Sequence, residues 1–338
     1  MAQLTDDVTS LLNVLAADAS SNVHPLIDSP VSRFGRHSNA TQEQASDCTA
    51  GSALTKAAKL QAELSPLEQN ALEALSNIGT LYALNVADDK NPQVFGTDGQ
   101  YIPRATAAIG KLRCFWDIES WNVQLVAWKG TDLGSEAKMK KTFGLGLAPA
   151  KAQEAAALTA KVVQEIPALQ GGRQPLLTLN AFSAPANELH GKRVLLGDGL
   201  LDVFGTLGFG DVAPEAVLGH EYGHQVDFAN GNSPGDESRE LGPDAYGGYF
   251  LAHAKGDAWN ARTQQEVTYL DASIGDCAHD HGTPDQRKAA GAWGEKLATS
   301  QANPNRIISP ASIIEKFQKE YPKLVPSSGR QSASAARS

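Results

Sequence analysis

The sequence predicts an α+β protein that is dominated by helices and carries one small, mainly antiparallel sheet. Several segments show apolar residues at helical spacing behind clear capping signals, whereas only short segments have the alternation of strands. Clusters of Gly, Pro, Asn and Ser separate these segments. With 338 residues, of which 41% are apolar, the chain is long enough for one large domain or two ordinary ones.

The N-terminal part of the chain has helical character. Residues 5–17 form a short amphipathic pattern, and a second pattern covers residues 52–64. The segment 19–51 between them is rich in Ser, Asn, Asp and Pro and shows no period, which indicates a loop. Ser65-Pro66-Leu67-Glu68 combines a capping box with a proline at the first helical position and predicts a further helix. We therefore expect residues 1–110 to form an N-terminal helical region with an extended loop.

The central part has strand character. Residues 111–118 and 122–129 carry alternating or continuous apolar residues around several tryptophans and predict two strands joined by a tight turn. An Ala-rich helix is expected over about 149–166. Residues 175–183 and 192–197 then predict a second pair of strands.

Helices are expected again in the C-terminal part. Asp211 and Pro214 mark a helix start, and Asn230-Gly231 supplies a left-handed stop. A further helix is expected over roughly 240–255. Thr283-Pro284-Asp285-Gln286 is a capping box for a helix to about 300, and Ser309-Pro310 opens the last helix. We take 111–325 as one domain and 326–338 as a disordered tail.

Charge and composition limit the functional classes. The net charge of −9 and the absence of a basic stripe argue against nucleic-acid binding. No apolar run approaches the length of a membrane span. The N-terminus lacks the basic and apolar regions of a signal peptide, which predicts a soluble protein of the cytoplasm, or of the periplasm or exterior if a presequence was removed. Cys48, Cys114 and Cys277 favour free buried thiols over a disulfide.

The segment His220-Glu221-Tyr222-Gly223-His224 carries the clearest chemical signal. Two histidines four positions apart stack on one face of a helix and can bind one tetrahedral zinc ion. Glu221 flanks this face, where it can act as general base on a water molecule that zinc polarises. Gly219 and Gly223 each cost about 1 kcal/mol in a helix, which suggests that another backbone approaches closely. The alternative is a surface helix with an incidental histidine pair.

A third protein ligand is needed, and Glu240 is the best candidate. Asp244 follows it by four residues, so both carboxylates would share one face of the next helix. Glu240 can ligate zinc, while Asp244 can accept a hydrogen bond from the outer nitrogen of a ligating histidine. Rivals for the ligand role that lack such a partner are Asp227, Asp236 and Glu237.

This arrangement resembles the His-Glu-x-x-His and Glu-x-x-x-Asp pattern of the gluzincin metallopeptidases, which include the HtpX-like membrane proteases. Upstream, Asn180-Ala181-Phe182 and residues 194–201 are similar to strands of the HtpX-like group. Downstream, residues 280–287 resemble a His-Gly-x-x-x-Gln-Arg element of the neutral zinc metallopeptidases of bacteria. The resemblance covers about residues 175–300.

The resemblance implies a zincin-like domain in which His220, His224 and Glu240 are the zinc ligands. It also implies that Glu221 is the base and that Asp244 supports a ligating histidine. In one respect this chain departs from the HtpX-like pattern, because Pro243 stands before Asp244. Since proline disturbs a helix interior, we expect that helix to begin only near Glu240.

The tetrahedral intermediate of peptide hydrolysis needs a hydrogen-bond donor for its oxyanion. The sequence offers several candidates without choosing among them: Tyr246, Tyr249, His253, His281 and Arg287. Alternatively, His281 braces the helix that begins at Pro284, and Arg287 pairs with Asp276 or Asp280.

The primary hypothesis is a zinc endopeptidase with one zinc ion per chain. A polypeptide substrate would lie extended along an edge strand formed by residues 192–197 or 176–183. One alternative is a binding module in which zinc is structural, with all four positions filled by protein ligands. Another is a zinc hydrolase that cleaves a non-peptide amide.

Overall fold

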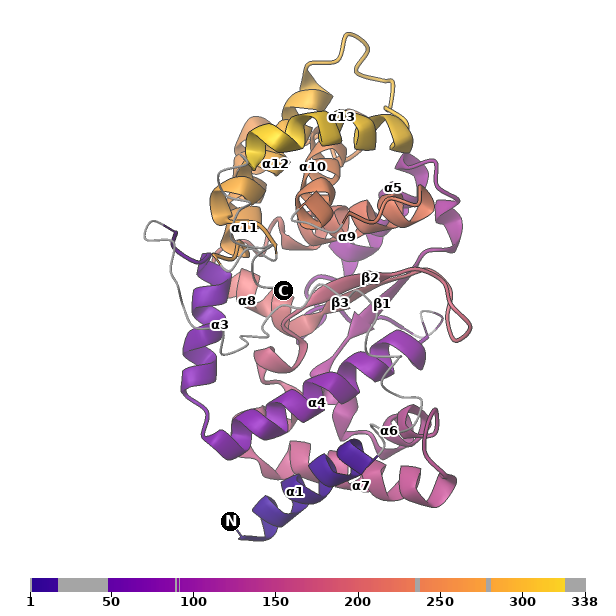
Figure 1. Ribbon diagram of the computed structural model, residues 1–338, viewed down its shortest axis with the longest axis vertical. Coiled ribbons are helices and arrows are strands. Elements are labelled where there is room, and N and C mark those ends of the chain that lie inside the picture. Colours follow the sequence, from indigo (N-terminus) through magenta and orange to yellow (C-terminus); the bar gives the residue numbers. More distant parts are fainter. Residues whose placement is uncertain are drawn as a thin grey trace, which may run out of the picture. The chain divides into compact units, whose positions relative to one another are not determined.

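The computed structural model describes residues 2–17, 48–88, 90, 92–234, 238–277 and 281–325. Within these residues the protein is dominated by helices and contains a small three-stranded sheet (Figure 1). The α+β class is therefore confirmed at this coarse level. No described helix combines the length and the apolar character that crossing a membrane would require. The tail 326–338 lies outside the described residues.

The chain divides into two compact units, each assembled from several segments. Unit 1 takes in the described residues of 1–36, 56–103 and 123–206. Unit 2 takes in those of 37–55, 104–122 and 207–338. These units interleave along the chain, which differs from the consecutive ranges 1–110 and 111–325 expected from the sequence. Composition along a sequence reports local character and does not reveal which distant segments pack together.

Unit 1 holds the sheet and a set of helices that bury their apolar faces. These helices are α1 (Ala2–Ala17), most of α3 (Ser52–Ala62), α4 (Pro66–Asn85), α6 (Glu136–Phe143), α7 (Pro149–Glu165) and α8 (Asp198–Thr206). The capping box predicted at the start of α4 is confirmed, because Ser65 accepts from the backbone of Glu68 and donates its own N–H to the Glu68 carboxylate. The core of this unit joins residues from α4, α7 and the sheet, including Leu75, Val163 and Leu195.

The sheet consists of β1 (Gln124–Trp128), β2 (Ala181–Ala184) and β3 (Arg193–Gly197), with β3 in the centre (Figure 1). β2 pairs with β3 antiparallel, as expected, but β1 pairs with β3 parallel. The sheet is therefore mixed and not mainly antiparallel. Because β3 is paired on both sides, residues 192–197 do not form an edge to which a peptide could add, and that alternative was wrong. β2 is an edge strand of this sheet.

Of the expected strands, the one at 111–118 is absent, and the one at 175–183 begins only at Ala181. Residues 111–115 end helix α5 (Ile102–Phe115), and a 3-10 turn, η1 (Ser120–Asn122), precedes β1. The buried residues of α5 recur at intervals of three or four, namely Ala105, Ala108, Ile109, Leu112 and Phe115. The end of this helix, from Lys111 onward, is a short apolar run that by itself resembles a strand. Likewise, residues 175–178 form the 3-10 helix η4 (Pro175–Thr178) ahead of β2.

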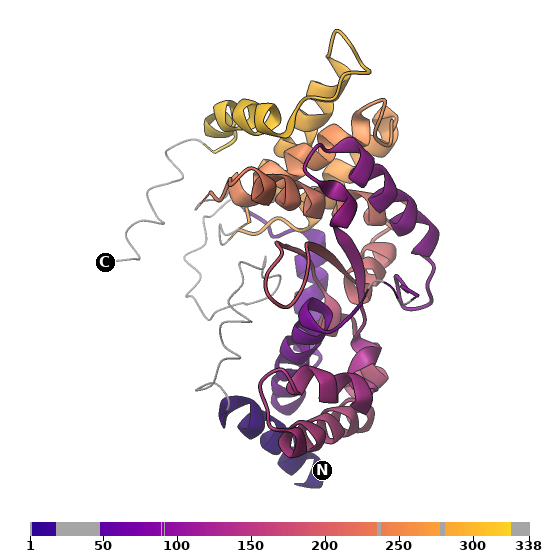
Figure 2. The same cartoon turned by 90° about the vertical axis from the view of Figure 1, so that its right-hand side faces the viewer.

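Unit 2 is helical in its described part. Besides most of α5 it contains α9 (Ala213–Ala229), α10 (Ser238–Ala252), α11 (Ala261–Ser273), α12 (Pro284–Thr299) and α13 (Pro310–Leu324). The predicted capping box of α12 is present. Helix α13 is drawn in yellow in Figure 2. Its Phe317 ring packs against Tyr246 of α10 at a centroid distance of 6.0 Å. Helix α11, as well as α6 and α8 in unit 1, was not predicted from the sequence.

Glycines let α10 lie unusually close to two other helices. A Cβ atom on Gly219 of α9 would lie 3.3 Å from the Cα atom of Gly247 on α10. On the other side, a Cβ atom on Gly248 of α10 would lie 2.3 Å from the backbone oxygen of Gly291 on α12. The close approach that the sequence predicted for the glycines of α9 is therefore present, and it fixes α10 between α9 and α12.

Gly248→Ala is expected to destabilise unit 2 strongly, because the added methyl group would overlap the backbone of Gly291. Such overpacking against backbone typically costs about 1–3 kcal/mol or more. The matched control is Gly110→Ala in α5, where a Cβ atom would meet nothing within 4 Å. That change is expected to stabilise the helix by about 0.5–1 kcal/mol. Equal unfolding midpoints of the two variants in urea would contradict this description of the helix packing.

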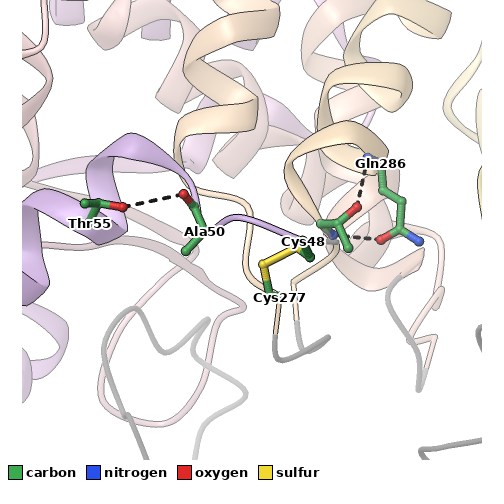
Figure 3. Close-up of a disulfide and its surroundings, with 6 residues drawn as sticks. Cys48, Ala50, Thr55, Cys277 and Gln286 are labelled. Carbon is green, nitrogen blue, oxygen red and sulfur yellow. Dashed lines mark hydrogen bonds between the residues drawn. A yellow bond between two sulfur atoms is a disulfide. The ribbon is translucent and has the colours of Figure 1, made fainter. Parts of the chain in front are cut away.

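The cysteines differ from the expectation of free buried thiols. Cys48 and Cys277 form a disulfide with a Cα–Cα distance of 5.8 Å (Figure 3). Cys114 is free and exposed. The backbone of Gly51 donates to the carbonyl oxygen of Gly275, so hydrogen bonding joins the same two segments. The two cysteines are 229 positions apart, and sequence spacing gives no indication that they meet.

Candidate metal centre

Helix α9 presents the two histidines on one face, as the spacing predicted. The imidazole rings of His220 and His224 have centroids 4.9 Å apart. Their side chains are 11% and 10% exposed, respectively. The Nε2 atom of His224 is buried and has no hydrogen-bond partner among the described residues. A buried nitrogen without a partner is costly unless something else binds it.

Helix α10 brings the carboxylate of Glu240 to the same place. Its Oε2 atom lies 3.4 Å from Nε2 of His220 and 3.7 Å from Nε2 of His224. Donor atoms that lie about 2.0–2.2 Å from a tetrahedral zinc ion are separated by roughly 3.3–3.6 Å. Three donor atoms, one from each residue, lie within 4.8 Å of one another. This buried cluster could therefore hold a metal ion.

Electrostatics make the cluster attractive to a cation. Burial disfavours the imidazolium form of His220, but the Asp244 and Glu240 carboxylates outweigh it and raise its pKa to about 10. Burial also disfavours the ionised form of Glu240, yet the neighbouring imidazoles of His224 and His220 hold its pKa well below the usual value. The carboxylates that favour the protonated form of His220 would stabilise a divalent cation in the same way.

Glu221 lies beside this face. Its side chain is buried, and burial raises the pKa of its carboxyl group, whereas the charges of the two histidines act in the opposite direction. The position next to His220 on α9 keeps Glu221 close to the cluster without making it one of the three donors.

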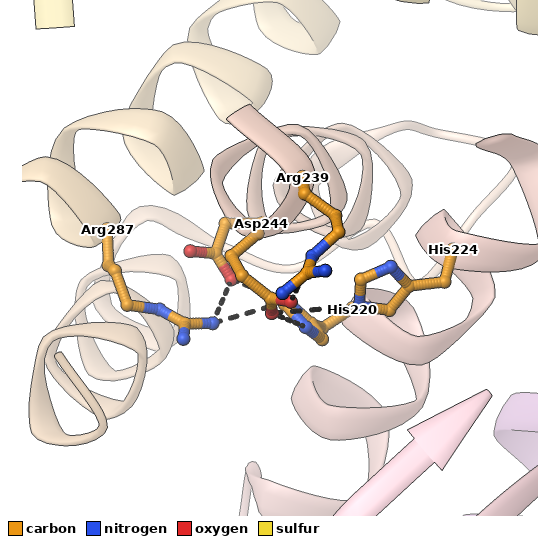
Figure 4. Close-up of polar contacts among 6 residues, drawn as sticks. His220, His224, Arg239, Asp244 and Arg287 are labelled. Atoms are coloured by element: carbon orange, nitrogen blue, oxygen red, sulfur yellow. Dashed lines mark hydrogen bonds and ion pairs between the residues drawn. The ribbon is translucent and has the colours of Figure 1, made fainter. Parts of the chain in front are cut away.

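Asp244 lies one turn after Glu240 on α10 and contacts the far side of His220. Its Oδ1 atom is 2.6 Å from Nδ1 of His220, a distance at which the ring N–H donates to the carboxylate. This hydrogen bond leaves Nε2 of His220 as the nitrogen that faces Glu240 and could bind a metal. Figure 4 shows how His220, Asp244 and Arg287 meet.

Arg287 pairs with Asp244, a partner that the sequence did not predict, and Asp280, one of the two partners that it offered, lies outside the described residues. Its Nη2 atom donates to Oδ1 of Asp244 over 2.7 Å, and both side chains are 1% exposed. Burial disfavours the ionised form of Asp244, but the guanidinium group of Arg287 and the imidazole of His220 lower its pKa. A series of polar contacts thus runs from α12 through α10 to α9.

Asp271 on α11, which the sequence did not single out, interacts with this pair. Burial and the charge of Asp244 raise the pKa of Asp271 well above its usual value, whereas Arg287 acts in the opposite direction. A Cβ atom on Gly291 of α12 would lie 2.5 Å from Oδ2 of Asp271, so the glycine provides the space for this carboxyl group. The N-cap Asn260 and the spacing of Val267 and Leu270 could have revealed the helix.

Other residues that the sequence offered as metal ligands or oxyanion donors interact with groups outside the metal cluster. Asp227, a rival ligand, accepts a hydrogen bond from Asn232 and interacts with the Tyr246 hydroxyl group. Tyr249 accepts hydrogen bonds from Gln301 and from the backbone of Ile308.

His253 accepts a hydrogen bond from the backbone of Lys255 and packs against Phe115. His281 is described just ahead of α12, and its role stays a prediction. The rivals Asp236 and Glu237 lie outside the described residues.

Helix α10 begins at Ser238, close to the start expected near Glu240, and contains Pro243 in its interior. A Cβ atom on Gly223 of α9 would lie 2.6 Å from the Cα atom of Pro243, so the missing side chain makes room for the proline. Glu240 therefore lies within the first turn of a helix that continues through Asp244.

Comparisons of the chain with protein-family models, with curated proteins and with solved structures gave no match in any of the three searches.

Proposed function

We propose that this protein is a zinc-dependent peptidase. The observation that carries the proposal is the convergence of three buried donor atoms, from His220, His224 and Glu240, with Glu221 next to the first of them. A zincin-like domain of the gluzincin type remains part of the proposal, on the strength of the sequence motifs.

Zinc is the metal that best fits this donor set. Two imidazole nitrogens and one carboxylate oxygen are typical of zinc enzymes with an open coordination position. Calcium and magnesium prefer six or more oxygen ligands. A structural zinc site would need a fourth protein ligand, and the cluster formed by the described residues has three members. This count supports catalysis over the structural alternative.

Peptide hydrolysis requires a group that accepts a proton from water and a site that binds the carbonyl group of the substrate. Zinc would act as a Lewis acid that acidifies water and polarises the substrate carbonyl. Glu221 accepts a proton from the attacking water while the water oxygen bonds to the carbonyl carbon and the C=O electron pair moves to the carbonyl oxygen. The C–N bond then breaks as the leaving nitrogen takes the proton from Glu221. A peptide aligned along an edge strand such as β2 stays a prediction.

The disulfide bears on the compartment. Disulfides persist mainly in oxidising compartments, so the bond between Cys48 and Cys277 supports the periplasmic or secreted alternative over the cytoplasm.

Metal analysis tests the proposal most directly. The protein, stripped with chelator and titrated with zinc, is expected to bind one ion per chain and to gain thermal stability and peptidase activity together. His224→Ala should lose tight binding because it removes one donor, whereas His190→Asn in unit 1 should keep it. Full activity in the presence of chelator, or zinc binding unaffected by His224→Ala, would rule out this centre.

A further inference from the structure

The oxyanion donor of the proposed peptidase is not found among the tyrosines and histidines whose contacts are described above. Tyr246 and Tyr249 are almost fully buried, and the hydroxyl group of Tyr246 interacts with Asp227. His253 interacts with the backbone of Lys255. Arg287 is fully buried and donates to Asp244. A donor for substrate must instead be accessible and close to the three metal-binding atoms.

Arg239 meets both conditions. It precedes Glu240 on α10, its side chain is 44% exposed, and its Nε atom lies 3.6 Å from Oε1 of Glu240. In Figure 4 its guanidinium group points toward the centre where His220 and His224 meet. No hydrogen bond from its two Nη groups to another described residue is present, so these groups are available to a bound molecule.

The two carboxylate oxygens of Glu240 contact different residues. Oε2 faces the imidazole nitrogens of His220 and His224, whereas Oε1 faces Arg239. Arg239 is therefore one carboxylate group away from the atoms that would hold a metal ion. The scissile carbonyl group of a peptide must lie next to the ion for the polarised water to attack it. The free Nη groups of Arg239 are therefore within reach of the carbonyl oxygen.

We propose that Arg239 is the catalytic residue that donates a hydrogen bond to the scissile carbonyl oxygen and stabilises its developing negative charge. This assignment rests on the proposed peptidase function. A guanidinium group suits the role because it stays charged at all relevant pH values and has five donors in a fixed plane. One of them interacts with Glu240, which orients the plane and leaves the others for the substrate.

Kinetics on the zinc-loaded full chain test this assignment. Arg239→Gln is expected to lower kcat by about 10²–10³-fold with little change in KM, as for the loss of one oxyanion donor. Arg239→Lys should have a kcat between those of Arg239→Gln and the wild type, because it keeps the positive charge but lacks the planar array of donors. The matched control is Arg262→Gln on α11, which removes an exposed arginine whose Nε lies 3.4 Å from Glu266. The control should leave both constants unchanged.

Two binding measurements separate the catalytic role from others. Zinc affinity of Arg239→Gln should stay within about threefold of wild type, whereas a residue that only holds Glu240 in place would lower it 10–100-fold. A phosphinic peptide, whose tetrahedral anion imitates the oxyanion, should bind Arg239→Gln about 10²-fold more weakly. Binding of a neutral product peptide should not change.

These measurements distinguish failure of the Arg239 assignment from failure of the proposed peptidase function. If the wild type hydrolyses peptides and Arg239→Gln keeps its kcat, the assignment is wrong while the peptidase function stands. A rise in KM confined to substrates with acidic side chains would replace it with a specificity role. If the zinc-loaded wild type hydrolyses no peptide, the proposed function fails and the assignment fails with it.

Discussion

Glu221→Gln is expected to lower kcat for peptide hydrolysis by about 10²–10⁴-fold while zinc content and fold stay unchanged. The amide has nearly the volume of the carboxylate but cannot accept the proton of the attacking water. Glu221 is not one of the three donor atoms of the metal cluster, so its replacement leaves those donors in place. The measurement compares turnover of a peptide library with zinc content and circular dichroism on the same preparations.

A buried glutamate on the same helix provides the control. Glu215 also lies on α9, and its carboxylate accepts from Nε of Arg104 at 2.9 and 3.0 Å. Glu215→Gln should lower the free energy of unfolding, because it weakens a partly buried ion pair, but should not change turnover well below the unfolding temperature. Normal turnover in Glu221→Gln would eliminate the mechanism, and equal losses in both variants would indicate a structural effect.

Local signals predicted the parts of the site that lie on one helix. The spacing of His220 and His224 placed both rings on one face of α9, because an α-helix returns to the same face after four residues. The glycine at 219 predicted a close backbone neighbour, which is Gly247. The capping boxes of α4 and α12 fixed two helix starts, since they use side chains within three residues of each other.

Contacts between distant segments could not be predicted in the same way. Sequence alone did not reveal that Arg287 meets Asp244, because that contact depends on how closely α10 and α12 approach, which Gly248 and Gly291 decide. The parallel partner of β3 lies far upstream in β1 and follows no turn signal. The strand expected at 111–118 was wrong because a short apolar run does not separate a buried helix from a strand.

Substitutions of Glu240 and Asp244 on α10 are expected to lower zinc affinity to different extents. Glu240→Gln should lower zinc affinity most, because it changes a donor atom of the cluster. Asp244→Asn should lower it by about 10–100-fold, the usual effect of losing an outer partner of a ligating histidine. Isothermal titration with zinc measures both. If Asp244→Asn binds zinc like the wild type while changes at Asp236 or Glu237 abolish binding, the ligands have been assigned to the wrong carboxylates.

Besides its hydrogen bond to His220, Asp244 forms an ion pair with Arg287. A double variant can separate the effects of these two interactions. The Asp244 carboxylate neutralises Arg287, and both side chains are almost fully buried. Asp244→Asn and Arg287→Met should each lower the free energy of unfolding by about 3–5 kcal/mol, because each breaks this buried ion pair. The double variant should be more stable than the sum of these losses predicts, since it removes both charges.

The zinc affinities of these three variants should not follow the order of their stabilities. Arg287→Met keeps the carboxylate that accepts from Nδ1 of His220, so it should bind zinc nearly as well as the wild type. The double variant should bind zinc as weakly as Asp244→Asn, although its fold is partly restored. Chemical unfolding of the metal-free proteins and zinc titration of the folded ones measure the two quantities separately. If stability and zinc affinity recover together in the double variant, Asp244 acts on the metal only through the fold, and its hydrogen bond to His220 has no separate part in metal binding.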